Sequence, residues 1–223
     1  GRIIEEQVVR FITDKIIPAE KTINAEHEAT ESGRDSETVS LLRVEAKALG
    51  LWNLYLPDKV WGAGVSNHDY SLLCEHMGRS AAAPRVFNCQ APDTGNAEIL
   101  AEFGTDAQKA KWLTPLLEGE IRSCFSMTEP DTSGADPTGI RTHAVKDGDE
   151  YVINGHKWFT SGAVGAEFAI AMVVTNPKGN PHERASMLIV PTNTPGFDLI
   201  RSVSVMGHTG GGGHCEIQYN DCR

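Results

Sequence analysis

The sequence predicts an α+β fold, with an all-α helical domain over residues 1–120 followed by an antiparallel β-barrel or sandwich domain over residues 121–223. Apolar residues recur at helical spacing through most of the first part, whereas the second part consists of short β-prone runs separated by turn residues. Helices and strands that occupy separate halves of a chain are typical of the α+β class. A doubly wound parallel sheet is not expected, because that fold needs strands and helices to alternate.

The first half carries its own helix start and stop signals. Thr105 and Gln108 have the spacing of a capping box, and Gly119 is placed to end the helix that this box begins. Pro18 is expected to interrupt the first apolar stripe, because proline lacks the backbone N–H that a helix interior needs. The other helices are expected over residues 2–17, 37–49, 67–79 and 92–103.

The second half alternates between β-prone runs and turns. Asp147 and Gly148 separate two such runs, which is a good hairpin signal. Further along, Pro177, Gly179 and Pro181 mark a loop between two longer runs. The expected strands are residues 121–127, 140–145, 151–153, 168–175, 185–190, 197–200, 203–206 and 216–219.

The composition is that of an ordinary globular protein, with 40% hydrophobic and 22% charged residues among 223. A formal net charge of −10 argues against nucleic-acid binding, which needs a basic surface. No apolar run approaches the about 18 residues of a membrane span, so stable membrane insertion is not expected. The five cysteines are odd in number and form no C-x-x-C motif, which indicates a reducing compartment and neither a disulfide framework nor a zinc site.

Two runs are candidates for a binding site. In residues 124–136 a β-prone run ends in Thr128 and a loop of small residues follows, and residues 156–163 hold an aromatic pair. A hydroxyl at a strand end can bond the edge of a planar cofactor, and the small residues let such a group approach the backbone closely. Trp158 and Thr160 are expected to face the same way on a strand, one to stack on the cofactor and the other to bond it. The alternatives are a capped turn and a buried tryptophan beside a β-forming threonine.

The remaining motifs point to no specific chemistry. The glycine-rich residues 207–214 lack the phosphate-loop pattern and precede a strand rather than a helix, so a flexible turn is expected there. The eight histidines form no metal-binding motif, so no metal site is expected. Cys124 lies within an apolar strand and is expected in the core rather than as a nucleophile.

An ordered set of motifs carries more information than any one of them. Residues 125–130 read Phe-Ser-Met-Thr-Glu-Pro, and residues 154–160 read Asn-Gly-His-Lys-Trp-Phe-Thr. The others are Leu-Pro at 56–57, Trp-Gly-x-Gly at 61–64, Glu-x-x-Gly-Arg-Ser at 75–80, Pro-Gly at 195–196, Met-Gly at 206–207 and Glu-Ile at 216–217. Together they resemble the acyl-CoA dehydrogenase family over nearly the whole chain, in particular the branch that contains human family members ten and eleven and their bacterial relatives.

The resemblance implies the N-terminal helical domain and the middle β domain of an enzyme whose C-terminal four-helix bundle is absent from this chain. It implies FAD between the middle and C-terminal domains. The implied reaction is oxidation of an acyl-CoA thioester at Cα–Cβ to the 2,3-enoyl-CoA, as in fatty-acid β-oxidation, with electrons passed to electron-transfer flavoprotein. It further implies a homodimer or homotetramer at full length, in the bacterial cytoplasm or the mitochondrial matrix.

The site residues follow from the same resemblance, position by position. Those implied to bind FAD are Phe125, Met127, Thr128, Gly134, Trp158, Phe159 and Thr160, with Thr128 at the pyrimidine end and Thr160 near N5. Those implied to line the path of the acyl-CoA substrate are Ser133, Ala135 and Asp136. The family loop is often Thr-Glu-Pro-x-x-Gly-Ser-Asp, so the serine hydroxyl that would touch substrate is missing here or is supplied by Ser133. No catalytic residue is assigned in this chain, since the base belongs to the absent bundle and Glu129 matches a structural position.

Two other functions stay open at this point. A flavoprotein oxidase of the same fold, such as an acyl-CoA oxidase or a nitroalkane oxidase, would keep the flavin-binding residues and change the electron acceptor or the base. A non-catalytic fragment that binds a nucleotide or a partner is the other. Gly1 in place of a starting methionine, and an end just after a β-prone run, are features expected of part of a longer polypeptide.

Overall fold

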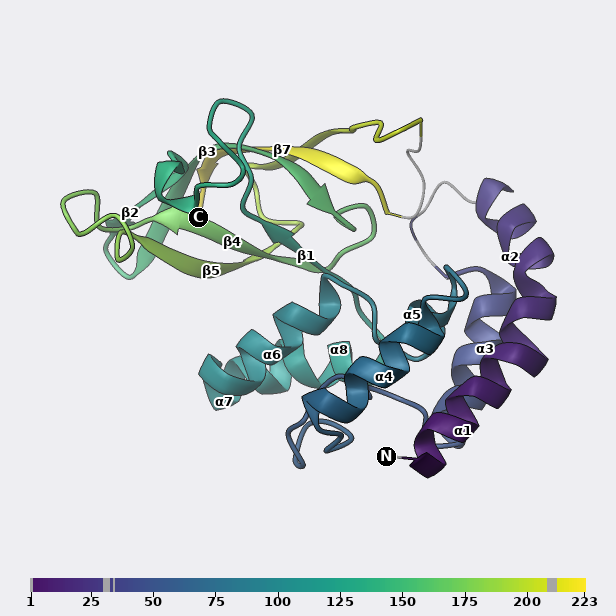
Figure 1. Cartoon of the computed structure of the whole chain (residues 1–223). Helices are drawn as coiled ribbons and strands as arrows, with labels where there is room; N and C mark the ends of the chain where they lie inside the picture. The colour runs from purple at the N-terminus through teal and green to yellow at the C-terminus, as the bar shows by residue number, and fades with distance from the viewer. Residues whose placement is uncertain (1, 30–32, 34, 208–211) are drawn as a thin grey trace. The chain divides into compact units, whose positions relative to one another are not determined.

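A computed structural model describes residues 2–29, 33, 35–207 and 212–223 of the chain. The chain divides into two compact units, Gly1–Glu120 and Ile121–Arg223. The first is helical and the second is built on a curled β-sheet, which confirms the predicted α+β class (Figure 1). Within the described residues no helix is both long and apolar enough to cross a bilayer.

The first helix of the chain is longer than expected. Helix α1 (Arg2–Phe11) runs through the π-helical turn η1 (Ile12–Ile16) into α2 (Ile17–Ala29). The prediction that Pro18 interrupts this stripe was wrong. The π turn lets the Ile17 N–H bond the Ile12 carbonyl, and Pro18 then falls in the first turn of α2, a position where helices tolerate proline.

Most of the remaining helices lie close to the predicted ranges, but α4 (Asn67–Met77) ends two residues earlier than expected and the short helix α5 (Ala83–Val86) was not predicted. Ser36 caps α3 (Glu37–Ala48) and Ser66 caps α4, each by accepting a backbone N–H bond three residues on. The Thr105–Gln108 capping box is present, and Gly119 ends the last helix in a left-handed conformation. The helical elements that follow α4 in the first unit are α5 (Ala83–Val86), α6 (Asp93–Phe103), α7 (Asp106–Gln108), the π-helical turn η2 (Lys109–Leu113) and α8 (Thr114–Glu118).

The described residues of the second unit form a seven-stranded sheet, in the order β1-β4-β2-β3-β7-β6 with β5 paired to β4. Its elements are β1 (Ser123–Ser126), η3 (Pro137–Gly139), β2 (His143–Asp147), β3 (Glu150–Ser161), β4 (Phe168–Val174), β5 (Ala185–Pro191), β6 (Phe197–Ser202) and β7 (His214–Cys222). The hairpin at Gly148 joins β2 to β3 as predicted. Val205 makes only an isolated bridge, so the expected strand over 203–206 is not formed.

The sheet is mixed rather than purely antiparallel. Strand β4 runs parallel to β1 and, over one residue pair, to β2, whereas the other pairings are antiparallel. Parallel neighbours need a long connection between them, and here the β2–β3 hairpin lies within the connection from β1 to β4. The alternating patterns of the sequence do not contain this information, because both kinds of pairing share the same two-residue period.

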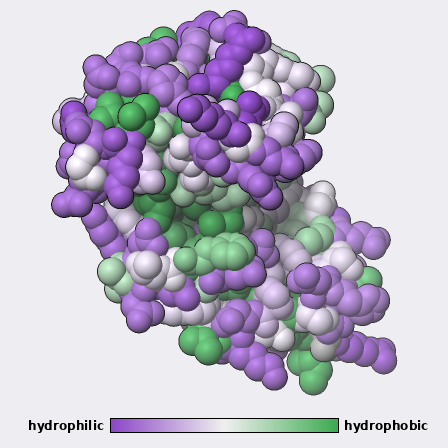
Figure 2. Space-filling view, turned by 90° about the vertical axis from the view of Figure 1, so that its left-hand side faces the viewer, coloured by the Kyte–Doolittle hydropathy of each residue, from purple (hydrophilic) through white to green (hydrophobic). Residues whose placement is uncertain are grey.

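The curled sheet encloses an apolar core to which most of its strands contribute. Cys124, Ile217 and Tyr219 lie in it with no measurable exposure, and the expectation that Cys124 belongs to the core is confirmed. Strand β4 is buried over nearly its whole length. Figure 2 shows the outside of the molecule from one side, with hydrophilic residues over most of that face and hydrophobic residues in smaller groups between them.

Candidate functional site

The end of β1 lies against β3, so the two candidate runs of the sequence meet. The Trp158 N–H donates to the Thr128 carbonyl at 2.9 Å, and the Lys157 Nζ donates to the Met127 carbonyl at 2.7 Å. Both acceptors follow the last residue of β1, Ser126, and both donors belong to β3. Two consecutive residues of one strand therefore hold two consecutive carbonyl groups of the segment beside it.

Beneath this junction is a buried ion pair. The Lys157 Nζ lies 3.0 Å from the Glu129 Oε1, and the two side chains are 0% and 4% exposed. The same carboxylate accepts the backbone N–H of Arg141 at 2.7 Å and of Thr142 at 2.8 Å. Glu129 is thus buried and engaged by three donors, and it ties the end of β1 to the start of β2.

The ion pair keeps its charges in spite of its burial. Burial works against the charged carboxylate, but hydrogen bonds from Thr142 and Arg141 and the Lys157 ammonium outweigh it, so the pKa of Glu129 lies below its ordinary value. Burial lowers the pKa of Lys157, and the attraction of Glu129 offsets this only in part. Glu129 thus favours the charged form of Lys157, whereas Glu129 itself is kept charged mainly by the hydrogen bonds from Thr142 and Arg141.

Strand β3 bulges immediately after Lys157. Lys157 pairs with Ile217 and Thr160 pairs with Cys215, so one extra residue is inserted into β3 between these pairs. Since Ile217 and Cys215 both face the core, Lys157 and Thr160 face it too, and Trp158 faces away. The expectation that Trp158 and Thr160 share a face was wrong, because the bulge breaks the two-residue alternation on which it rested.

Thr160 is consequently buried. It has no measurable exposure, and its hydroxyl lies 3.4 Å from that of Ser126, which is also fully buried. Thr160 thus packs on the core side of β3, and its implied contact with a flavin N5 stays a prediction.

Phe159 occupies the bulge with a φ of +50° and is 40% exposed. A positive φ is strained for a bulky side chain, and such strain is concentrated at functional sites. The Phe159 and Trp158 rings lie 4.6 Å apart at an interplanar angle of 48°. The bulge thus presents two adjoining aromatic rings where a regular strand would present one.

Five residues form a partly exposed surface at this junction. We call it the β1–β3 wall; its members are Phe125, Met127, Thr128, Trp158 and Phe159, all half-buried or exposed. Within the part of the chain that the structure describes, the Thr128 hydroxyl and N–H have no hydrogen-bond partner, whereas its carbonyl is bonded to β3. The β1–β3 wall therefore combines apolar rings with two polar groups that can bond a ligand.

The loop after β1 turns back toward Thr128. A Cβ atom on Gly134 would lie 3.4 Å from the Thr128 methyl carbon, so the absence of a side chain at Gly134 leaves space there. Ser133 and Ala135 are exposed. Asp136 caps η3, its carboxylate accepting the Thr138 N–H at 3.0 Å and the Thr138 hydroxyl at 2.6 Å, and these bonds hold its pKa below the ordinary value. Asp136 thus shapes the loop.

No metal site is found among the described residues, which contain no group of three or more possible ligands. His156 bonds Glu216 at 2.8 Å and His214 bonds the Ser161 hydroxyl at 2.7 Å, so both rings are used by neighbouring side chains. Four of the eight residues of the predicted flexible turn over 207–214, residues 208–211, lie outside the described part of the chain.

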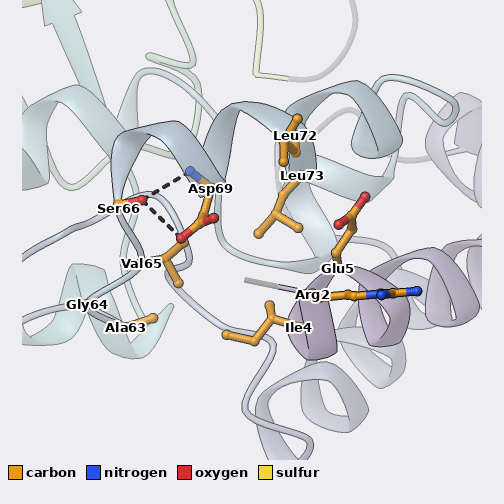
Figure 3. Close-up of a pocket in the computed structure, with 10 residues that line it drawn as sticks. All are labelled: Arg2, Ile4, Glu5, Ala63, Gly64, Val65, Ser66, Asp69, Leu72 and Leu73. Carbon is orange, nitrogen blue, oxygen red and sulfur yellow. Dashed lines mark hydrogen bonds between the residues drawn. The ribbon is translucent and has the colours of Figure 1, made fainter.

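A pocket of about 520 Å³ opens in the helical unit, between α1 and the start of α4 (Figure 3). Two of its polar side chains make contacts within the protein. The Ser66 hydroxyl accepts the Asp69 N–H as a helix cap, and Glu5 contacts His76 at 3.1 Å. The other lining residues shown are mainly apolar or small. This pocket presents no cluster of groups with an evident chemical task.

The match to known protein families covers both units. A model of the acyl-CoA dehydrogenase N-terminal domain matches residues 2–120, and a model of the acyl-CoA dehydrogenase middle domain matches residues 124–222. The chain belongs to the acyl-CoA dehydrogenase family. The resemblance predicted from the ordered motifs is therefore confirmed.

Individual relatives agree with this assignment. The chain is 44% identical over 232 residues to human acyl-CoA dehydrogenase family member 11, covering 100% of the chain and 29% of that relative. It is 44% identical over 230 residues to mouse family member 10, covering 100% of the chain and 22% of that relative. A solved structure from Mycobacterium abscessus, described as an acyl-CoA dehydrogenase, has a TM-score of 0.93 and 40% identity and matches 99% of this chain. The match covers 57% of that solved chain, so the chain spans only part of each relative.

Sequence reasoning named every residue of the β1–β3 wall but assigned no role to Lys157. The available signal was the lysine's position directly before an aromatic pair, because a lysine packed among such residues is almost never fully buried without a partner. The other half of the signal, Glu129, lies in the first acyl-CoA dehydrogenase motif. Their pairing required the register of β1 against β3, which the motifs do not encode.

Proposed function

We propose that the full-length protein containing this chain is an FAD-dependent acyl-CoA dehydrogenase that converts an acyl-CoA thioester to its 2,3-enoyl-CoA. Family membership supports the oxidoreductase class. The observation that carries the proposal within this chain is the β1–β3 wall, where exposed aromatic rings adjoin the unused N–H and hydroxyl of Thr128. Such a surface fits a flavin, which has a flat apolar face and a polar edge.

The proposal assigns each residue of the wall a task. Phe125, Met127, Trp158 and Phe159 would contact the ring system through apolar surface, with stacking from the aromatic rings. Thr128 would bond the polar edge of the ring with its N–H and hydroxyl. Gly134 would allow the loop to lie close to the bound group, whereas Thr160 would support the wall from the core side.

A bound flavin would supply the two-electron oxidant for breaking the Cα–H and Cβ–H bonds. Within this chain, Ser133 and Ala135 are the exposed loop residues that could meet the acyl-CoA substrate, with Asp136 holding their loop in shape. Glu129 is occupied by its ion pair and two backbone bonds, so we assign the proton-abstracting base to a part of the protein outside this chain.

Electron-transfer flavoprotein is the proposed electron acceptor, and a homodimer or homotetramer in the bacterial cytoplasm or mitochondrial matrix is the proposed working form. The test uses the purified full-length protein. We expect it to carry FAD, and we expect anaerobic addition of an acyl-CoA to bleach the visible absorbance of the oxidised flavin.

Reoxidation of the reduced enzyme then identifies the acceptor. Fast return of the absorbance with electron-transfer flavoprotein, and slow return with dioxygen alone, would support the dehydrogenase. Rapid reoxidation by dioxygen with release of hydrogen peroxide would instead identify an oxidase. A full-length protein that binds no flavin, or whose flavin no acyl-CoA reduces, would contradict the proposal.

A further inference from the structure

Lys157 touches the segment that carries Thr128 from the core side, opposite the exposed rings. We infer that Lys157 is a positioning residue for the flavin: its ammonium fixes the Met127 carbonyl and thereby sets the orientation of Thr128. This inference rests on the proposed function, since it names the residue that prepares the same site. Lys157 has no exposed surface, so it acts only through the residues that it holds.

The Lys157 ammonium makes two contacts, and each has a different role. One, at 2.7 Å, is to the Met127 carbonyl, which lies just beyond the end of β1 and outside the regular ladder with β4. The other, at 3.0 Å, is to Glu129, which compensates the buried charge. Met127 and Glu129 flank Thr128, so the lysine holds the residues on both sides of the proposed hydrogen-bonding group.

Trp158 completes the arrangement from the same strand. Its N–H bonds the Thr128 carbonyl at 2.9 Å, so residues 157 and 158 fix residues 127 and 128 in sequence. The bulge that follows places Phe159 beside Trp158 on the exposed side. The position of the rings relative to Thr128 thus depends on where Lys157 anchors the end of β1.

A lysine suits this position because it both donates a hydrogen bond and fills the core. Methionine would match the length of lysine but leave the Met127 carbonyl without its hydrogen bond. Because an unpaired buried carbonyl costs free energy, the segment that carries it would shift to a position where the carbonyl is bonded. A shift of this segment would misplace the N–H and hydroxyl of Thr128, and the loss of one such hydrogen bond lowers affinity about three- to tenfold, which is measurable.

The experiment measures FAD binding to the full-length protein in four forms: wild type, Lys157→Met, Glu129→Gln, and the double variant Glu129→Gln/Lys157→Met. Lys146→Met, at an exposed lysine of β2, is the control. The readouts are the dissociation constant of FAD, the position and shape of the bound-flavin absorption bands, and the thermal midpoint of the flavin-free protein.

The inference predicts that stability and flavin binding respond to different residues. Glu129→Gln is expected to lower the thermal midpoint yet change FAD affinity less than about threefold, because the Lys157 bond to Met127 remains. The double variant is expected to be more stable than Lys157→Met, since no charge is left unpaired, and still to bind FAD about three- to tenfold more weakly than wild type, with altered flavin bands.

The inference would be overturned if the double variant bound FAD with wild-type affinity and showed unchanged flavin absorption bands. The proposed function would then remain intact. FAD affinities that simply follow the thermal midpoints across the series would also overturn the inference, because that result describes a stabilising ion pair only. A wild-type full-length protein that binds no FAD would overturn the proposed function, and this inference with it.

Discussion

Lys157 and Glu129 form a 3.0 Å ion pair in which neither side chain is more than 4% exposed. The pair connects the end of β1, the start of β2 and the bulged part of β3 through the Met127 carbonyl and the N–H groups of Arg141 and Thr142. Removing one member leaves a buried charge with no opposite charge beside it, held only by neutral hydrogen-bond partners.

Lys157→Met is therefore expected to lower the free energy of unfolding of the flavin-free protein by about 3–5 kcal/mol, the usual loss when one partner of a buried pair is removed. Glu129→Gln/Lys157→Met should recover a substantial part of this loss, because it removes both charges together. Urea denaturation of the full-length variants measures the difference. Equal losses in the single and double variants would show that the charges are not coupled.

The stability that Glu129 provides should depend on pH. Its pKa in the folded protein lies below the 4.5 of an unperturbed glutamate, so the unfolded chain takes up this proton first as the pH falls. The contribution is complete above about pH 4.5 and is lost as the pH drops through the folded-state pKa. The stability gap between wild type and Glu129→Gln should accordingly shrink in acid and stay constant around neutrality. A gap that widens toward low pH would contradict the assignment.

Phe159 offers a test of backbone strain at the bulge. Its φ of +50° suits glycine better than any residue with a Cβ atom. Phe159→Gly should thus be more stable than Phe159→Ala by about 1–2 kcal/mol, the usual penalty of the left-handed conformation. The comparison removes the ring in both variants, so it isolates the backbone. Equal stabilities by chemical denaturation would mean that the bulge relaxes once the ring is gone.

Gly155 should tolerate no side chain, because a Cβ atom there would lie 2.3 Å from the Thr142 Oγ1 and 2.6 Å from the Thr142 Cα. Gly155→Ala is expected to destabilise the protein by about 3 kcal/mol, since backbone must move to admit the methyl group. Gly148→Ala is the matched control, with a φ of +63° and nothing within 4 Å of the added atom. The control should lose only about 1–2 kcal/mol. Similar losses at both positions would indicate that Thr142 can shift freely.

Local signals in the sequence were sufficient for much of this structure. The capping box at Thr105, the left-handed stop at Gly119 and the hairpin at Gly148 each depend on a few neighbouring residues, and each was predicted correctly. The motifs also identified the family. Such features follow from side-chain and backbone preferences that act within one or two turns of the chain.

The errors arose where distant segments decide the outcome. The bulge at Phe159 depends on how β3 pairs with β7, and it reversed the expected direction of Thr160. The π turn before Pro18 changed a predicted helix end into a continuation. The burial of Lys157 depends on the register of β1 against β3, and periodicity along one segment cannot reveal it.

The most direct test of the β1–β3 wall is the dissociation constant of FAD for the full-length wild type and for Thr128→Val, which removes only the hydroxyl while keeping the shape of the side chain. Thr194→Val, in the turn before β6, is the control. Loss of one hydrogen bond predicts FAD binding about three- to tenfold weaker in Thr128→Val and unchanged in the control. Identical FAD affinity in wild type and Thr128→Val, or no FAD binding by the wild type, would contradict the assignment of this wall to the flavin.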